Sequence, residues 1–319
     1  MAYKSFKHAH ISWRVFSVLR ALVGGAAAAA LLAGGGGAAF AQTPPTYTPP
    51  VFTPGTSIVQ TKHNLSSAGL TTQVNSFSGT TEVCVFCHTP HGSDTAAAVP
   101  LWNRQLNHGQ TYQTYDTLGT SSLNGGVLPV GSVSIACLSC HDGTQAMNLM
   151  LNQPGGGWGN TGAMTNGGSN GNQTAALAAG TWTGCDNLGA SCDATDIVWI
   201  GTDLRNDHPV GVEYCGGGVA GGGGSTVTGA CKNPDFKMPV SKTVNGNQVF
   251  WVDTAAGTTG VREKTDIQLY TRDFTTVGGT PVEPSVECAS CHDPHTAAQP
   301  TFLRVSNDQS GVCLSCHVK

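Results

Sequence analysis

The sequence is poor in charged residues, aromatic residues and periodic hydrophobic segments. Asp, Glu, Lys and Arg make up 11% of the 319 residues, and Phe, Trp and Tyr make up 7%. Glycine occurs 43 times, and glycine at this density favours irregular backbone over helix and strand interiors. Few segments repeat their apolar residues with the period of a helix or a strand, which excludes a helical bundle or a large sheet. We therefore expect few and short helices.

Basic residues are scarce outside the first 41 positions. Residues 1–41 contain four Lys or Arg, no acidic residue, and an apolar run that ends in the small-x-small site Ala39-Phe40-Ala41. This pattern predicts an export signal that is cleaved before Gln42; the alternative, a membrane anchor, is disfavoured by the glycines at 34–37. Cleavage lowers Lys and Arg from 15 to 11 against 19 Asp and Glu, a net charge of −8. No membrane span then remains, and so acidic a chain is a poor partner for nucleic acid.

Cysteine is the residue type that the sequence has in a meaningful pattern. Eight of the 12 cysteines form four CxxCH pentapeptides. Two thiols at this spacing can add to the two vinyl groups of one porphyrin, and the adjacent His becomes the proximal ligand of its iron. A lone copy would also fit a zinc half-site or a redox CxxC, but four copies, each ending in His, predict four covalently bound haem c groups. The residues are Cys84, Cys87 and His88; Cys137, Cys140 and His141; Cys288, Cys291 and His292; and Cys313, Cys316 and His317.

The four motifs form an internal repeat. The first and third extend to CxxCHxPH, ending at His91 and His295, whereas the second and fourth share the letters CLSCH. This order, A-B-A-B, indicates an ancestral two-haem unit that was duplicated. The alternative is chance likeness among haem sites, which the shared Pro-His makes less attractive.

The number of histidines matches the number of axial ligands that four haems need. After the signal and the four proximal ligands are set aside, five histidines remain. We expect His63, His91, His208 and His295 to be the distal ligands, with His108 as the spare. Methionine is the alternative distal ligand and would raise the reduction potential; the candidates are Met147, Met150, Met164 and Met238.

The repeat also predicts which haem each distal histidine serves. His91 follows His88 too closely to reach the far face of the same iron, so we expect it to ligate the haem of Cys137 and Cys140. By the same reasoning His295 would ligate the haem of Cys313 and Cys316. His63 and His208 then remain for the other two haems.

Four cysteines lie outside the motifs. In an exported chain an even remainder predicts disulfides. Short loops close most easily, so we favour Cys185–Cys192 and Cys215–Cys231 among the three pairings. An additional metal site that includes His208 is the alternative.

The chain order predicts a Pro/Thr-rich arm at 42–57 and one haem-binding domain at 58–319, with a Gly-rich and β insert at about 152–280. Short strands are expected at 196–200, 248–252 and 267–270, forming a small antiparallel region. The predicted fold class is a multihaem cytochrome c that is mostly irregular, with short helices at the CxxCH sites and a core built around four haems. The expected helix starts are Thr80, Thr81, Ser132, Ser134, Pro284, Ser285 and Asp308.

The motifs and the segments between them follow a recognisable order. They are KHNLS at 62–66, CVFCHTPH at 84–91, PLWNR at 100–104, CLSCHDGT at 137–144, NDHPV at 206–210, CASCHDPH at 288–295, FLR at 302–304 and CLSCHVK at 313–319. This order resembles OmcE-like tetrahaem cytochromes, which polymerise into extracellular filaments with a continuous haem chain. The resemblance covers most of residues 61–319, but not the arm, the Gly-rich loops or the four extra cysteines.

The resemblance implies that every haem is bis-His ligated and that one distal His comes from the neighbouring subunit of a head-to-tail homopolymer. Carried over, His63 is expected to be that ligand. Extracellular electron acceptors or donor cytochromes are the other partners implied.

Three functions fit the sequence. The first is a secreted electron conduit that polymerises into a conductive filament and is not an enzyme. The second is a discrete periplasmic tetrahaem carrier. The third is a multihaem redox enzyme, which needs an open sixth position on an iron and is disfavoured by the histidine count.

Overall fold

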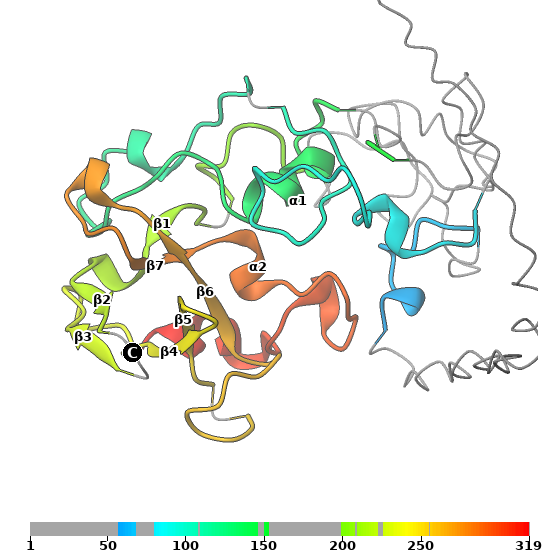
Figure 1. Ribbon diagram of the computed structural model, residues 1–319. Helices are drawn as coiled ribbons and strands as arrows, with labels where there is room; N and C mark the ends of the chain where they lie inside the picture. The colour runs from blue at the N-terminus through cyan, green and yellow to red at the C-terminus, as the bar shows by residue number, and fades with distance from the viewer. Residues whose placement is uncertain are drawn as a thin grey trace, which may run out of the picture. The chain divides into compact units, whose positions relative to one another are not determined.

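Short elements separated by irregular segments make up the described part of the chain (Figure 1). The computed structural model describes residues 57–67, 80–107, 109–145, 150–152, 199–207, 209–222, 226–254 and 256–318, all within the unit Val51–Lys319. The predicted signal, most of the arm, His108, His208 and the pair Cys185–Cys192 lie outside these ranges. None of the described helices has the length and hydrophobicity that a membrane span requires.

Each CxxCH motif begins within a short helix, as predicted. The first motif lies on a 3-10 helix, η2 (Cys84–Phe86), and the others on α1 (Ser134–His141), α2 (Cys288–Cys291) and α3 (Gly311–Cys316). The expected helix starts were mostly wrong, because the residues at the N-caps are Val83, Val133, Glu287 and Ser310. Further 3-10 helices are η1 (Ile58–Gln60), η3 (Tyr115–Thr117), η5 (Tyr214–Gly216), η6 (Thr275–Val277), η7 (Pro300–Phe302) and η8 (Asp308–Ser310).

The β region is antiparallel, as predicted. A five-stranded sheet has the order β1-β7-β6-β5-β4, and a two-stranded sheet pairs β2 with β3. Strands β5 and β6 confirm the expected strands at 248–252 and 267–270, whereas the described end of the third, Trp199 and Ile200, is not a strand. The strands are β1 (Val212–Glu213), β2 (Val219–Gly221), β3 (Val227–Gly229), β4 (Val240–Val244), β5 (Asn247–Val252), β6 (Ile267–Arg272) and β7 (Glu283–Val286).

The hairpin between β4 and β5 follows from its two turn residues. Asn245 and Gly246 have φ values of 49° and 81°, and Val244 pairs with Asn247 across the turn. Asn-Gly is the favoured sequence for a two-residue hairpin turn, because both positions need positive φ. This hairpin supplies β5, whose Phe250, Trp251 and Val252 are buried.

The sheet supplies a protein core of its own, in addition to the core that was expected around four haems. Tyr214, Phe250 and Ile267 are each 1% exposed or less and belong to one apolar cluster. Cys291 and Cys316 pack against this cluster. The β region therefore holds the third and fourth motifs and is more than a peripheral insert.

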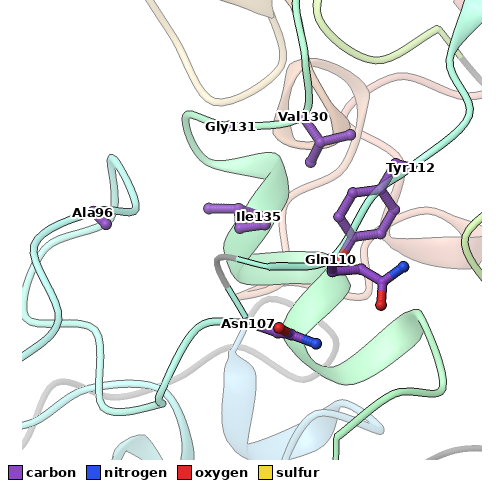
Figure 2. A pocket seen from close by; sticks show the side chains of 7 residues that line it. All are labelled: Ala96, Asn107, Gln110, Tyr112, Val130, Gly131 and Ile135. Atoms are coloured by element: carbon purple, nitrogen blue, oxygen red, sulfur yellow. The ribbon is translucent and has the colours of Figure 1, made fainter.

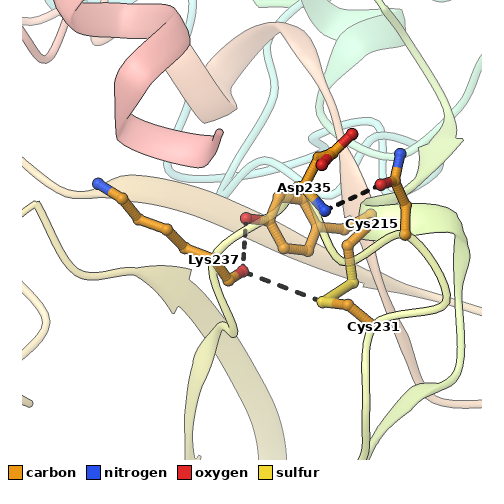
Figure 3. The surroundings of a disulfide bond; sticks show 6 residues. Cys215, Cys231, Asp235 and Lys237 are labelled. Atoms are coloured by element: carbon orange, nitrogen blue, oxygen red, sulfur yellow. Dashed lines mark hydrogen bonds between the residues drawn. A yellow bond between two sulfur atoms is a disulfide. The ribbon is translucent and has the colours of Figure 1, made fainter. Parts of the chain in front are cut away.

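One of the two predicted disulfides is present among the described residues. Cys215 and Cys231 are bonded, with their Cα atoms 5.3 Å apart (Figure 3). The Lys237 carbonyl oxygen accepts a hydrogen bond from the hydroxyl of Tyr214 at 2.9 Å, beside the disulfide. The bridge ties η5 to the segment that runs beneath α3, since Lys237 N donates to Cys316 O at 2.7 Å.

Candidate metal centres

Two of the four proximal histidines, His88 and His292, are oriented by main-chain carbonyls. Nδ1 of His88 donates a hydrogen bond to Pro100 O, and Nδ1 of His292 donates to Thr301 O, each at 2.7 Å. A carbonyl can only accept, so Nδ1 carries the hydrogen in both rings. Nε2 is then the nitrogen with a free lone pair, and an outer hydrogen bond of this kind is the usual support for a metal-bound imidazole.

The two CxxCHxPH copies share one backbone frame. In the first copy, Asn103 N donates to Cys87 O at 2.8 Å; in the second, Arg304 N donates to Cys291 O at 2.8 Å. The residue after the proximal histidine also makes an equivalent hydrogen bond in each copy. Thr89 N donates to Leu101 O, and Asp293 N donates to Phe302 O, both at 2.8 Å. Isolated bridges place Trp102 and Leu303 opposite the respective histidines. This correspondence supports a duplicated unit.

The ring of His295 faces the ring of His88. Their centroids are 6.3 Å apart, with 15° between the ring planes. Two imidazoles that bind one metal from opposite sides, with metal–nitrogen bonds of about 2 Å, hold their centroids about 6 Å apart. Nδ1 of His295 donates to Oδ1 of Asp293 at 3.0 Å, which leaves its Nε2 for a metal. The pair therefore has the spacing and the outer hydrogen bonds of two axial ligands.

The ring of His63 faces the ring of His141 in the same way. The centroids are 6.1 Å apart and the planes are inclined by 67°. Nδ1 of His63 donates to Pro294 O at 3.3 Å, and Phe302 lies flat against the ring at 4.3 Å. Burial, followed by the neighbouring His141, lowers the pKa of His63 to about 4. A neutral ring is the form that ligates iron.

These pairs favour axial pairings that differ from two of the sequence-based ones. His295 was expected to serve the motif of Cys313 and Cys316, but its ring lies beside that of His88 in the first motif. His91 was expected to serve the second motif, but the ring beside His141 is that of His63. The repeat shows which residues are equivalent and not which copy each side chain approaches.

The ring of His91 has no described partner, unlike that of His295, although both side chains are exposed. Its carbonyl oxygen accepts hydrogen bonds from Asn152 and Thr89, while its ring makes no hydrogen bond, ion pair or ring contact within the described residues. Met150 and Met238 are both described, and neither lies in one of the two imidazole pairs.

Cysteines of successive motifs lie near enough to affect one another electrostatically. Burial and then the charge of Cys140 raise the pKa of Cys87 to about 12. Burial and then the charge of Cys291 raise the pKa of Cys316 to about 12. Between them, a hydrogen bond joins the thiols of Cys137 and Cys288 and raises the pKa of Cys137. Attachment to porphyrins would convert these thiols to thioethers, so what matters here is that each motif has the next one in its neighbourhood.

A buried polar network joins α1 to α2, and sequence reasoning missed it. Glu287 caps α2: its side chain accepts from the backbone of Ser290, and its own N–H donates to Ser290 Oγ at 2.9 Å. The same carboxylate accepts from Ser134 Oγ at 2.5 Å and from Arg272 Nη1 at 3.1 Å. Burial raises the pKa of Glu287, and the bonds from Ser134 and the charge of Arg272 oppose that rise. An S/T/D/E residue before a CxxCH helix is the only sequence signal that could have found it.

A cavity beside α1 is separate from these ligands. It has a volume of about 180 Å³ and its lining includes Tyr112, Gln110 and Ile135 (Figure 2). No CxxCH cysteine and no candidate ligand lines it. Within the described ranges, no three His, Cys, Asp or Glu side chains converge as a metal-binding group. The arrangement present is instead two pairs of imidazoles, with ring centroids 6.3 Å and 6.1 Å apart.

Thiol pairs beside imidazole pairs are the side chains that covalent haem attachment and axial ligation use. A family model described as a doubled CXXCH motif matches residues 280–319, which contain the third and fourth motifs. The doubled motif indicates covalently bound haem c and a role in electron transfer. No curated protein matches the chain.

Proposed function

We propose that the chain binds four haem c groups and carries electrons along them as a conduit, without catalysing a reaction. When bound, the haem groups supply the one-electron redox chemistry. The polypeptide attaches them through eight thiols and places imidazoles on both sides of each iron. The single observation that carries the proposal is the pair of facing rings, His88 with His295 and His63 with His141, at the spacing of two axial ligands.

The first pair of motifs takes its distal ligands from elsewhere in the same chain. His295 from the second copy serves His88, and His63 serves His141. A conduit needs its centres close together, and the contacts from Cys87 to Cys140 and from Cys137 to Cys288 support one continuous series. His208 lies outside the described residues and remains our candidate for the His292 or His317 site.

Polymerisation would account for His91. In the repeat, the Pro-His of the second copy serves the motif of the preceding copy. The His91 side chain is exposed and has no described ring beside it, so we propose that it serves a motif of the second pair in a neighbouring chain, at His292 or His317. We therefore replace His63 by His91 as the cross-subunit ligand, because the ring of His63 faces His141 of its own chain. A head-to-tail contact of this kind does not close and builds a filament, as in OmcE-like cytochromes. This reading favours secretion over the periplasm.

The variant His91→Ala tests the polymer. The secreted protein should retain four haems per chain, lose its filaments in electron micrographs and show one high-spin haem in four by electron paramagnetic resonance. Gln110→Ala, also on the described surface of the first half, is the matched control and should form normal filaments. Filaments with only low-spin haem in His91→Ala would contradict the cross-subunit assignment.

The alternative functions predict different results. A discrete periplasmic carrier would be monomeric in both the wild type and His91→Ala. A multihaem enzyme would show a five-coordinate, high-spin iron in the wild-type protein, since substrate needs a vacant position.

A further inference from the structure

The second and third motifs meet at a joint made by one buried carboxylate. Glu287 is 1% exposed and is both the N-cap of α2 and the acceptor for Ser134, the first residue of α1. Ser134 Oγ accepts in turn from Cys288 N at 3.0 Å. The hydroxyl therefore lies between the start of one haem-attachment helix and the start of the next.

The joint is fully satisfied and shielded from water. Beyond Ser134 and Ser290, the carboxylate accepts from Ser285 Oγ at 2.9 Å and is paired with Arg272 at 3.1 Å. Arg272 also donates to Pro129 O at 2.9 Å, which anchors the strand β6 to the chain just before α1. A buried network with every member satisfied holds a single geometry, whereas losing one partner leaves a buried group unpaired.

The joint lies at the boundary between the two two-motif units. It lies where the first two-motif unit ends and the second begins, and the thiols of Cys137 and Cys288 touch there. Apolar packing of Leu138 against Cys288 lies on the same contact, but packing alone is non-directional. The Ser134–Glu287–Cys288 bonds join the two helix starts directly and in a fixed direction, and Arg272 supports them through Glu287 and Pro129.

We propose that Glu287 is a positioning residue that sets the spacing between the second and third haems, and hence the electron transfer between the two halves of the chain. The inference rests on the proposed attachment of four haems. Glu287 acts through Ser134 and the backbone of Cys288 and touches no iron ligand. Its charge, together with that of Arg272, also sets the local potential: removing the negative charge raises the midpoint potentials of the adjoining haems, because the partly buried cation then remains without its partner.

Two buried serines allow a matched test in the intact, haem-loaded protein. Ser134→Ala removes the bond that crosses between the helices, whereas Ser290→Ala removes a bond of the same network within α2 alone. Both serines are fully buried, so both variants should lower the unfolding midpoint. Only Ser134→Ala should weaken the Soret circular-dichroism couplet that reports neighbouring haems. Equal couplets in both variants and the wild type would overturn the proposal.

Glu287→Gln provides a second readout that does not depend on the serine variants. Gln preserves the shape of the side chain, so a rise in the midpoint potentials of two of the four haems is expected in a redox titration followed by absorbance. Unchanged potentials with four haems bound would overturn the charge role. Fewer than four haems in the wild type would instead refute the proposed function.

Discussion

The two CxxCHxPH copies have the same backbone frame but use it differently. In the second copy Asp293 holds His295 against His88, and Glu287 caps the helix with a buried network. In the first copy Thr89 stands in place of the aspartate, the helix is a 3-10 turn, and His91 is exposed. Both histidine side chains are exposed, but the ring of His295 lies beside that of His88, whereas no described ring lies beside that of His91. We call His295 the internal connector, and we propose His91 as the external one.

Replacing the internal connector, His295, should have the largest effect on the difference between the two copies. His295→Ala should leave the iron attached beside His88 with one axial ligand, because no other described histidine faces that ring. We expect one of four haems to become high-spin in the absorption spectrum, with reduced haem loading of the protein. A fully low-spin His295→Ala protein would show that His88 has a different partner.

The disulfide should contribute the next largest effect, and only to the second half. Cys215 and Cys231 enclose a separation of 16 residues, and a bridge of that size is worth about 3 kcal/mol. The double variant Cys215→Ala/Cys231→Ala should lose about that much free energy of unfolding in denaturant titrations. The low-spin signals from the His88 and His141 sites should persist. Equal stability with and without the bridge would contradict this expectation.

The stability of the second half should also depend on pH, because it contains a buried pair of carboxyl groups, Glu213 and Glu283. Glu213 Oε2 accepts from Gly126 N at 2.8 Å and Glu283 Oε1 from Thr280 N at 3.0 Å, while the two remaining oxygens are buried without another donor. Burial, then the bond to Glu283, raises the pKa of Glu213 to about 7, against the opposing charge of Lys232.

The sign of the effect follows from that raised pKa. The folded state holds a proton that the unfolded chain releases near pH 4.3, so this stabilisation is complete below about pH 4.3 and is lost as pH rises through 7. The loss should be about 2–3 kcal/mol. Denaturant titrations at pH 5 and 8 measure it, and Glu213→Gln should flatten the difference. A wild-type stability that rises over this range would contradict the shared proton.

The smallest expected effect compares the residues that follow the two proximal histidines. Asp293→Asn weakens the acceptor of the His295 Nδ1 hydrogen and makes that imidazole a poorer donor to ferric iron. We expect a modest rise in the midpoint potential of one haem, with spin state unchanged. Thr89→Asp, at the equivalent position of the first copy, adds a buried carboxylate next to His88 and should instead lower the midpoint potential of the haem bound there.

Sequence reasoning predicted the local features and missed the long-range ones. The CxxCH motifs, strands β5 and β6 and the bond Cys215–Cys231 were readable because each depends on residues close together in the chain. The contact of His295 with His88 and the bond of Ser134 to Glu287 join residues from opposite halves. Nothing in a single sequence reports such partners, since spacing defines a motif but not the surface that it meets.

A cryo-electron microscopy map of the secreted protein that resolves the imidazole rings tests the account most directly. We predict four haems per chain, with His88 and His295 on one iron, His63 and His141 on another, and His91 on an iron of the adjacent chain. An iron that carries His63 and a proximal histidine from a different chain, or an iron with one face open, would contradict it.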